Sequence, residues 1–137
     1  MALVSCQPTP TATPQPTGPT QIVLVADGSL GGLVAYLRTT TIDMKTGAFT
    51  VESASAEPVT GSVPAADREA LAALVEETGF LDYEADYIPI DGTCCDLVAY
   101  TVTVTVGGES HSVRASDENM PEGFRTLLSR IQALTGQ

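Results

Sequence analysis

The chain has one histidine, His111, so this is the first residue to weigh as a general base. A serine hydrolase needs a nucleophile beside that base, and the usual nucleophile turn has glycines two residues before and two residues after the serine. Ser29 follows Gly28 directly, which is not that spacing, and the segment lacks the lysine of a phosphate-binding loop. We predict that the protein is not an enzyme, and that His111 is a packed or half-exposed strand residue.

Cys94 and Cys95 are adjacent in the sequence. A structural zinc site takes four ligands, and two neighbouring thiols with one histidine are too few and badly spaced. We therefore predict no metal site and no cofactor. The two thiols either form a vicinal disulfide, which is strained because disulfides prefer more separated Cα atoms, or remain reduced and buried.

Acidic residues dominate the middle of the chain, where residues 69–113 contain nine Asp or Glu and no Lys or Arg. Asp82, Glu84 and Asp86 alternate as calcium ligands often do. An EF-hand loop that began at Asp82 would need glycine at its sixth position and glutamate at its twelfth, where Tyr87 and Thr93 stand. The pattern therefore favours a solvated acidic surface over a calcium site.

The connection over residues 82–96 has no regular pattern, and long connections of this kind are often functional. It combines apolar groups suited to the centre of an interface with carboxylates that attract a basic or metal-containing partner. Alternatively, Tyr87 and Ile88 cover one end of a sheet. The predicted partner-binding residues are Asp82, Tyr83, Glu84, Asp86, Tyr87, Ile88, Pro89, Ile90 and Asp91.

The N-terminal residues Leu3-Val4-Ser5-Cys6 resemble a bacterial lipobox. That resemblance implies that the Cys6 thiol receives a diacylglyceryl group and that a peptidase cuts just before Cys6. Residues 7–20 hold five Pro and five Thr, a composition that stays extended rather than folding. The alternative is a disordered tail with an incidental cysteine.

Only five residues precede Cys6 and none is basic, so we expect the rest of the signal peptide to have been lost from this sequence. Residues 1–6 are then a remnant of the signal peptide and lipobox, residues 7–20 a stalk, and residues 21–137 one domain. The predicted location is extracytoplasmic, with a lipid at Cys6 as the only membrane attachment.

Composition agrees with one folded domain, since 43% of the 137 residues are apolar. The net charge of −11 repels phosphates, which excludes a nucleic-acid partner. The sequence contains no run of 18 apolar residues and so no transmembrane helix.

The expected elements are two hairpins and two helices. Residues 21–26 are a short β-prone run, followed by a flexible glycine segment over 27–32. Strands at 33–43 and 48–53 flank a turn with Gly47 at positive φ, and strands at 97–106 and 109–115 flank Gly107-Gly108. Pairing Val106 with Glu109 would place His111 opposite Val104.

The first helix is expected from Pro64 to a left-handed cap at Gly79, and the second to start near Pro121. Their apolar stripes are Leu71, Leu74 and Val75, and Phe124, Leu127, Leu128, Ile131 and Leu134. The order hairpin, helix, hairpin, helix predicts an α+β fold: an antiparallel sheet built from two β-hairpins, with both helices on one face.

Several stretches resemble the emfourin-like family of small bacterial proteins, named for an inhibitor of thermolysin-type metalloproteases. They are residues 28–33, 71–80, 96–104, 111–114 and 121–128. The resemblance implies an anchored binding domain that inhibits a secreted thermolysin-type metalloprotease. The alternative is a structural or ligand-binding envelope lipoprotein with no protease target.

Overall fold

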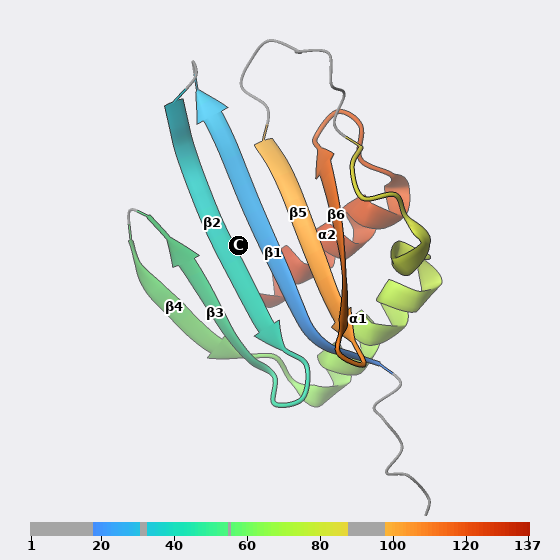
Figure 1. Cartoon of the computed structure of the whole chain (residues 1–137). Helices are drawn as coiled ribbons and strands as arrows, with labels where there is room; N and C mark the ends of the chain where they lie inside the picture. Colours follow the sequence, from blue (N-terminus) through green and yellow to red (C-terminus); the bar gives the residue numbers. More distant parts are fainter. Residues whose placement is uncertain (1–17, 31–32, 55, 88–97) are drawn as a thin grey trace, which may run out of the picture.

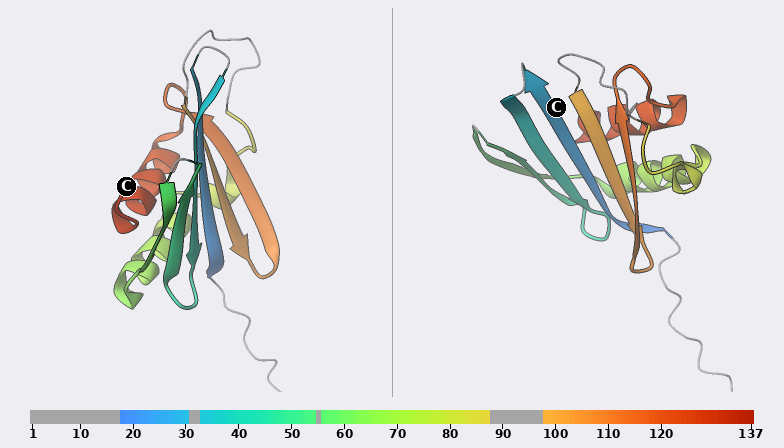
Figure 2. Two further views of the ribbon diagram at one scale, coloured as in Figure 1. Left: turned by 90° about the vertical axis from the view of Figure 1, so that its left-hand side faces the viewer. Right: turned by 45° about the horizontal axis from the view of Figure 1, so that its top comes forward.

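A computed structural model describes residues 18–30, 33–54, 56–87 and 98–137 (Figure 1). Cys6, Cys94 and Cys95 lie outside the described residues, as do Ile88, Pro89, Ile90 and Asp91. The described residues form an antiparallel sheet with two α-helices packed on the same face (Figure 2). The predicted α+β class and the placement of both helices on one face are confirmed.

The sheet has six strands in the order β4-β3-β2-β1-β5-β6. The prediction of a sheet made only of two hairpins was therefore wrong. β1 lies between the hairpins and pairs with both β2 and β5, while β4 pairs with β3. The strands are β1 (Pro19–Leu30), β2 (Leu33–Asp43), β3 (Ala48–Ser53), β4 (Ala56–Ser62), β5 (Val98–Val106) and β6 (Glu109–Ser116).

The expected flexible segment after Ala26 is instead the end of β1, which continues to Leu30. Gly28 pairs with Tyr36 on one side and with Val98 on the other, and the register shifts between Gly28 and Ser29. A glycine inside a strand often marks such a bulge, since it adapts to the local bend at low steric cost. Neighbouring strands on both sides therefore hold this part of the chain in the sheet.

The helices are α1 (Ala65–Glu77) and α2 (Glu122–Leu134), and Pro64 lies just before α1 rather than at its first position. Gly79 has φ 68°, the predicted left-handed conformation, and leads into the short 3-10 helix η1 (Phe80–Asp82). The core lies between helices and sheet. Its fully buried members include Ile22, Leu24, Ile42, Leu71, Phe80, Val102, Val104, Val113, Phe124, Leu127 and Ile131.

Both predicted turns have the conformation that their glycines favour. Gly47 has φ 85°, and Gly107 and Gly108 have φ 58° and 84°. Val106 pairs with Glu109 and Val104 with His111, so the predicted register of the second hairpin is confirmed.

Candidate functional site

The antiparallel topology separates two ends of the sheet (Figure 1). β1 ends at Leu30, β5 begins at Val98 and β6 ends at Ser116; we call this the loop end. Gly18, the first described residue, and the turn between β5 and β6 lie at the opposite end, which we call the tail end. The candidate partner-binding residues that the structure describes lead from η1 toward the loop end.

Residues 83–87 run along the outer edge of β6, because the backbone of Arg114 is paired on that side. The Arg114 N–H donates to the carbonyl oxygen of Ala85 over 2.9 Å, and the Tyr87 N–H donates to the carbonyl oxygen of Arg114 over 2.8 Å. Asp86 and Arg114 thereby form a parallel β-bridge. The first half of the predicted loop thus lies alongside β6 through one short β-bridge and protects part of that sheet edge.

The rings of Tyr83 and Tyr87 face the protein and are half-buried. Tyr83 meets Phe80 edge-on at a centroid distance of 6.1 Å, and Tyr87 meets Tyr83 edge-on at 6.1 Å. Burial raises the pKa of Tyr83 above its ordinary value, and Tyr87 adds to the effect. The two tyrosines are therefore anchors for the segment rather than freely exposed contact groups.

His111 belongs to the same packing arrangement. Its Nε2 lies 3.0 Å from the carbonyl oxygen of Tyr83, and its ring meets Phe80 edge-on at 5.7 Å. Gly123, in the first turn of α2, leaves room for the Tyr83 hydroxyl where a side chain would collide with it. His111 is half-buried, as expected for a packed strand residue.

Asn119 fixes the end of the described segment. Its Nδ2 donates to the carbonyl oxygen of Tyr87, while its Oδ1 accepts from the N–H and the hydroxyl of Ser116, at 3.1 and 2.6 Å. The Tyr87 hydroxyl accepts from the Glu84 N–H over 3.1 Å. Tyr87 is thus held at both its backbone and its ring, which sets one fixed point beside residues 88–97.

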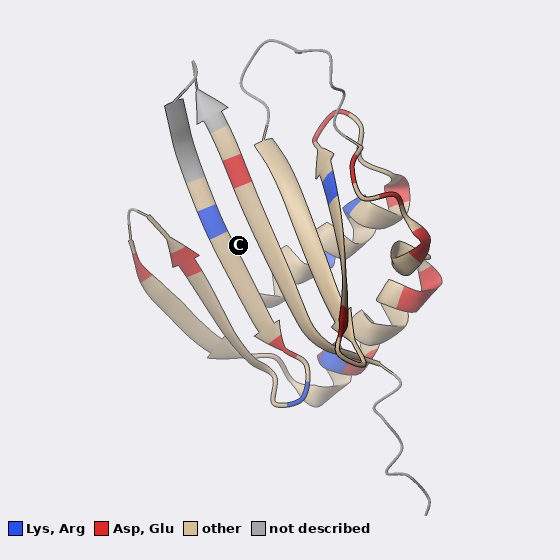
Figure 3. Cartoon of the chain, viewed as in Figure 1, with Lys and Arg blue, Asp and Glu red and all other residues tan. Residues whose placement is uncertain are grey.

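The carboxylates of this segment point outward. Asp82, Glu84 and Asp86 belong to exposed residues, and Figure 3 shows acidic positions along the end of α1, η1 and the connection that follows. On the outer face of the sheet, Nη2 of Arg114 lies 4.0 Å from Oδ1 of Asp27. Within the described ranges, no three His, Cys, Asp or Glu residues are grouped so as to hold a metal ion.

Sequence reasoning missed the residues that hold this segment in place, namely Arg114, Asn119 and Gly123. Arg114 acts through its backbone, so no side-chain pattern marks it. Gly123 could have been noticed as a helix-disfavouring residue in a first turn. In the part of the chain that the structure describes, no helix is both long and apolar enough to cross a membrane.

The fold and this segment define a small α+β domain in which aromatic anchors hold an acidic connection against a sheet edge. The emfourin family model matches residues 47–132, more than half of the chain, and the chain therefore belongs to the emfourin family. This is an inhibitor-type domain and not a catalytic family. Comparison with curated proteins finds no match.

The matched residues include β3, β4, α1, β5, β6 and all but the last two residues of α2, but not β1 or β2. They include all of the candidate residues from Asp82 to Asp91, whereas Gly28 and its neighbours lie before the match. Since β1 joins the two hairpins into one sheet, the family fold is completed here by residues that precede the matched region.

Proposed function

We propose that this domain binds and inhibits a secreted metalloprotease of the thermolysin type, with the loop end of the sheet as its contact surface. Membership of the emfourin family, whose match includes the acidic connection, carries this proposal. The connection also has the chemistry of a protein-binding element, because its carboxylates are exposed while its tyrosines are held by the core.

The residues on either side of 88–97 are held in place by the domain, which supports a binding role for this segment. Tyr87 is held by Asn119 and Arg114 on one side, and Val98 is paired with Gly28 on the other. A loop whose two ends are fixed loses less conformational entropy when it binds than one on a mobile base. Pro89 restricts the backbone further. Ile88 and Ile90 then supply the apolar contacts, and Asp82, Glu84, Asp86 and Asp91 supply the charge that attracts a basic partner.

We further propose that the domain is attached to the outer surface of the cell by a lipid at Cys6. Gly18 lies at the tail end, and β1 separates it from the loop end by about 36 Å, the length of a 12-residue strand. A tether at the tail end would leave the loop end directed away from the membrane. It would also raise the local concentration of inhibitor at the cell surface, where a secreted protease could cleave envelope proteins.

The test of inhibition uses the full chain and a thermolysin-type protease acting on a peptide substrate. We expect inhibition by the wild type and at least about a tenfold loss on replacing Ile88→Gly, Pro89→Ser and Ile90→Gly together, which removes roughly 1.4 kcal/mol or more of binding free energy. Val59→Ser, at an exposed apolar residue on the opposite sheet edge, is the matched control and should inhibit normally.

Circular dichroism and thermal unfolding of each variant separate a lost contact from a lost fold. A wild type that inhibits no protease of this class would contradict the proposal. Recovery of envelope components alone in a pull-down would then favour a structural or ligand-binding lipoprotein. Inhibition that survives the triple replacement would move the contact surface to the β1–β2 hairpin, which lies at the same end of the sheet.

The lipid anchor is tested separately by expressing the chain behind a complete signal peptide with a labelled fatty acid. The wild type should take up label and Cys6→Ser should not. Equal labelling of the two would refute the anchor and leave the inhibition proposal untouched.

A further inference from the structure

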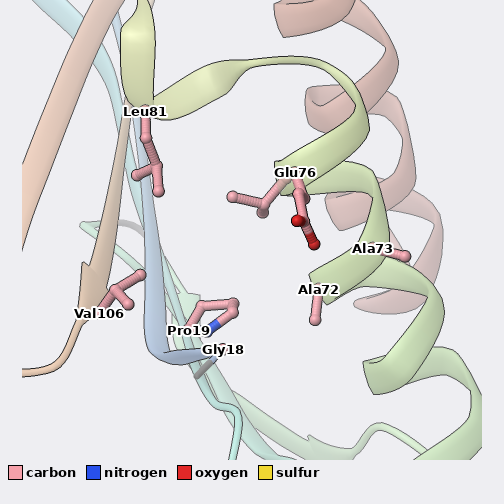
Figure 4. A pocket seen from close by; sticks show the side chains of 8 residues that line it. Gly18, Pro19, Ala72, Ala73, Glu76, Leu81 and Val106 are labelled. Carbon is pink, nitrogen blue, oxygen red and sulfur yellow. The ribbon is translucent and has the colours of Figure 1, made fainter. Parts of the chain in front are cut away.

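A groove lies at the tail end of the domain, between α1 and the ends of β1 and β5 (Figure 4). One cavity of about 420 Å³ shares Leu81 and Val106 with a second of about 360 Å³, so the two form one surface feature, the Leu81 groove. The first is lined by Gly18, Pro19, Ala72, Ala73, Val75, Glu76, Leu81 and Val106. The second is lined by Leu81, Val104, Val106, Glu109, Ser110 and His111.

The α1 side of this groove is mainly apolar, while the side along β6 is about equally polar and apolar. Leu81 borders both hollows with 44% of its surface exposed. An exposed leucine on its own needs no explanation. Here it borders two adjoining hollows whose other walls include Pro19 and Val106, which gives a concave apolar surface able to receive side chains. The fully buried Phe80 holds η1 to the core, whereas Leu81 leaves much of its surface in the groove.

The open edge of β6 runs beside the groove. Arg114 directs its backbone N–H and carbonyl outward to residues 85 and 87, and the alternation of a strand directs those of Ser112 and Ser110 the same way. Among the described residues, no segment pairs with β6 at these two serines. An extended chain placed there would continue the line of residues 83–87 and satisfy those backbone groups.

Charge distinguishes which chain would fit. Glu76 projects from the α1 wall in Figure 4, and Glu109 stands exposed at the start of β6. The whole protein carries a net charge of −11. A second copy of this chain would bring the same negative charge to the groove, whereas a segment with lysine or arginine beside its apolar residues would complement it.

We propose that the Leu81 groove and the adjoining edge of β6 bind an extended basic segment of a partner protein by strand addition. The guest backbone pairs with Ser110 and Ser112. Side chains on one face of the guest strand enter the groove, apolar ones around Leu81 and Val106 and basic ones toward Glu76 and Glu109, which line the same groove. The groove lies toward the tail end of the sheet, although Leu81 adjoins Asp82, the first residue of the proposed protease contact. The inference does not depend on that function.

The probe is a capped seven-residue peptide with lysine at both ends, valine at its third and fifth positions and serine between them, so that lysines and valines share one face of a strand. It is labelled for fluorescence anisotropy and titrated with the full chain. We expect saturable binding that weakens as salt is added. A peptide with glutamate in place of lysine, and one with N-methylated valines that cannot donate backbone hydrogen bonds, should each bind at least about tenfold more weakly.

Variants locate the site on the protein. Leu81→Asp should weaken binding at least about tenfold, whereas Val59→Asp, on the other sheet edge, should not. Ser112→Pro removes the outward N–H at an edge position where proline is tolerated, and should also weaken binding about tenfold. Its matched control is Ser112→Ala, which likewise loses the 2.7 Å hydroxyl contact with Thr103 but keeps the N–H.

Hydrogen exchange gives a readout that needs no variant, since peptide binding should slow exchange of the Ser110 and Ser112 amides. Slowed exchange along β4 instead, equal binding of the glutamate peptide, or undiminished binding by Leu81→Asp would each overturn the proposal. A wild-type dimer that Leu81→Asp converts to a monomer would also overturn it, because the occupant would be a second copy. A tighter peptide complex after removal of residues 1–17 would assign the groove to the chain's own tail, and so would overturn it too.

Discussion

Two hairpins at opposite edges of the sheet, β3–β4 and β5–β6, differ sharply in how much of the core they supply. The β5–β6 hairpin buries Val102, Val104, Val113 and Ala115 beneath the helices. The β3–β4 hairpin contributes Val51 alone to the fully enclosed residues, and every residue of β4 is exposed. Figure 1 shows β4 at the sheet edge farthest from β6.

The difference arises because the helices cover only part of the sheet. Beyond the end of α2, the inner face of the β3–β4 hairpin borders an open hollow of about 210 Å³ lined in part by Val51, Val59 and Thr135. Apolar residues on this hairpin therefore lose little contact with water on folding, and the hydrophobic contribution to stability is concentrated on the β5–β6 side.

The largest effect should come from removing an aromatic side chain on the buried side. Phe80 is fully buried among Tyr83, His111 and Phe124, so Phe80→Ala should lower the free energy of unfolding by about 3–5 kcal/mol. Val59 is 57% exposed, and Val59→Ala should change it by less than about 0.5 kcal/mol. Urea denaturation measures both free energies of unfolding. Comparable losses would show that the β3–β4 hairpin contributes as much hydrophobic stabilisation as the β5–β6 side.

The turns allow a matched test of backbone geometry. Gly47 and Gly108 have nearly the same φ, 85° and 84°, but a Cβ at Gly47 would collide with the carbonyl oxygen of Val63 whereas one at Gly108 would meet no atom within 4 Å. Gly108→Ala should cost about 1–2 kcal/mol for the left-handed conformation alone. Gly47→Ala should cost more, because the collision is added to the same strain; equal losses in thermal unfolding would show that Val63 moves aside freely.

The same contrast explains how far the sequence could predict the fold. The β5–β6 hairpin and both helices have clear apolar periodicity and strong turn residues. The predicted register is confirmed, and the predicted stripes face the core, with Leu74 and Leu134 only partly buried. β4 has no such pattern because neither of its faces is buried, so the sequence Ala-Glu-Pro-Val-Thr-Gly-Ser carries no signal of a strand. Gly28 was predicted to lie in a flexible segment for a related reason, since glycine in a bulged strand resembles glycine in a loop.

Prediction of the candidate site was limited by long-range contacts. The composition of residues 82–91 marked the segment as unusual, but nothing in it showed that Tyr83 and Tyr87 turn inward. That orientation depends on Asn119 and on the backbone of Arg114, which are about 30 residues away in the sequence and reach the segment only through the fold. Pairing of this kind leaves no local periodicity to detect.

A smaller effect should follow from uncovering the edge of β6. Asn119→Ala removes the bonds to Tyr87 and Ser116 and leaves buried polar groups without that partner, which should cost about 1–3 kcal/mol. Hydrogen exchange should quicken at the amides of Tyr87 and Arg114 while those of the β3–β4 hairpin stay unchanged. Faster exchange throughout the sheet would show instead that Asn119 supports the whole fold.

The smallest effect concerns acid, at the turn between β2 and β3. The Asp43 carboxylate accepts from the N–H groups of Lys45 and Thr46, at 2.8 and 3.2 Å, and these bonds lower its pKa below 3.8. Since the folded pKa is depressed, the stabilisation is present above the unfolded pKa and is lost as pH falls through the folded value. NMR titration below pH 5 should show the amides of Lys45 and Thr46 shifting with a midpoint below 3.8. Asp43→Asn keeps an oxygen acceptor and should abolish the shift; a midpoint at or above 3.8 in the wild type would mean that the two bonds do not favour the charged form.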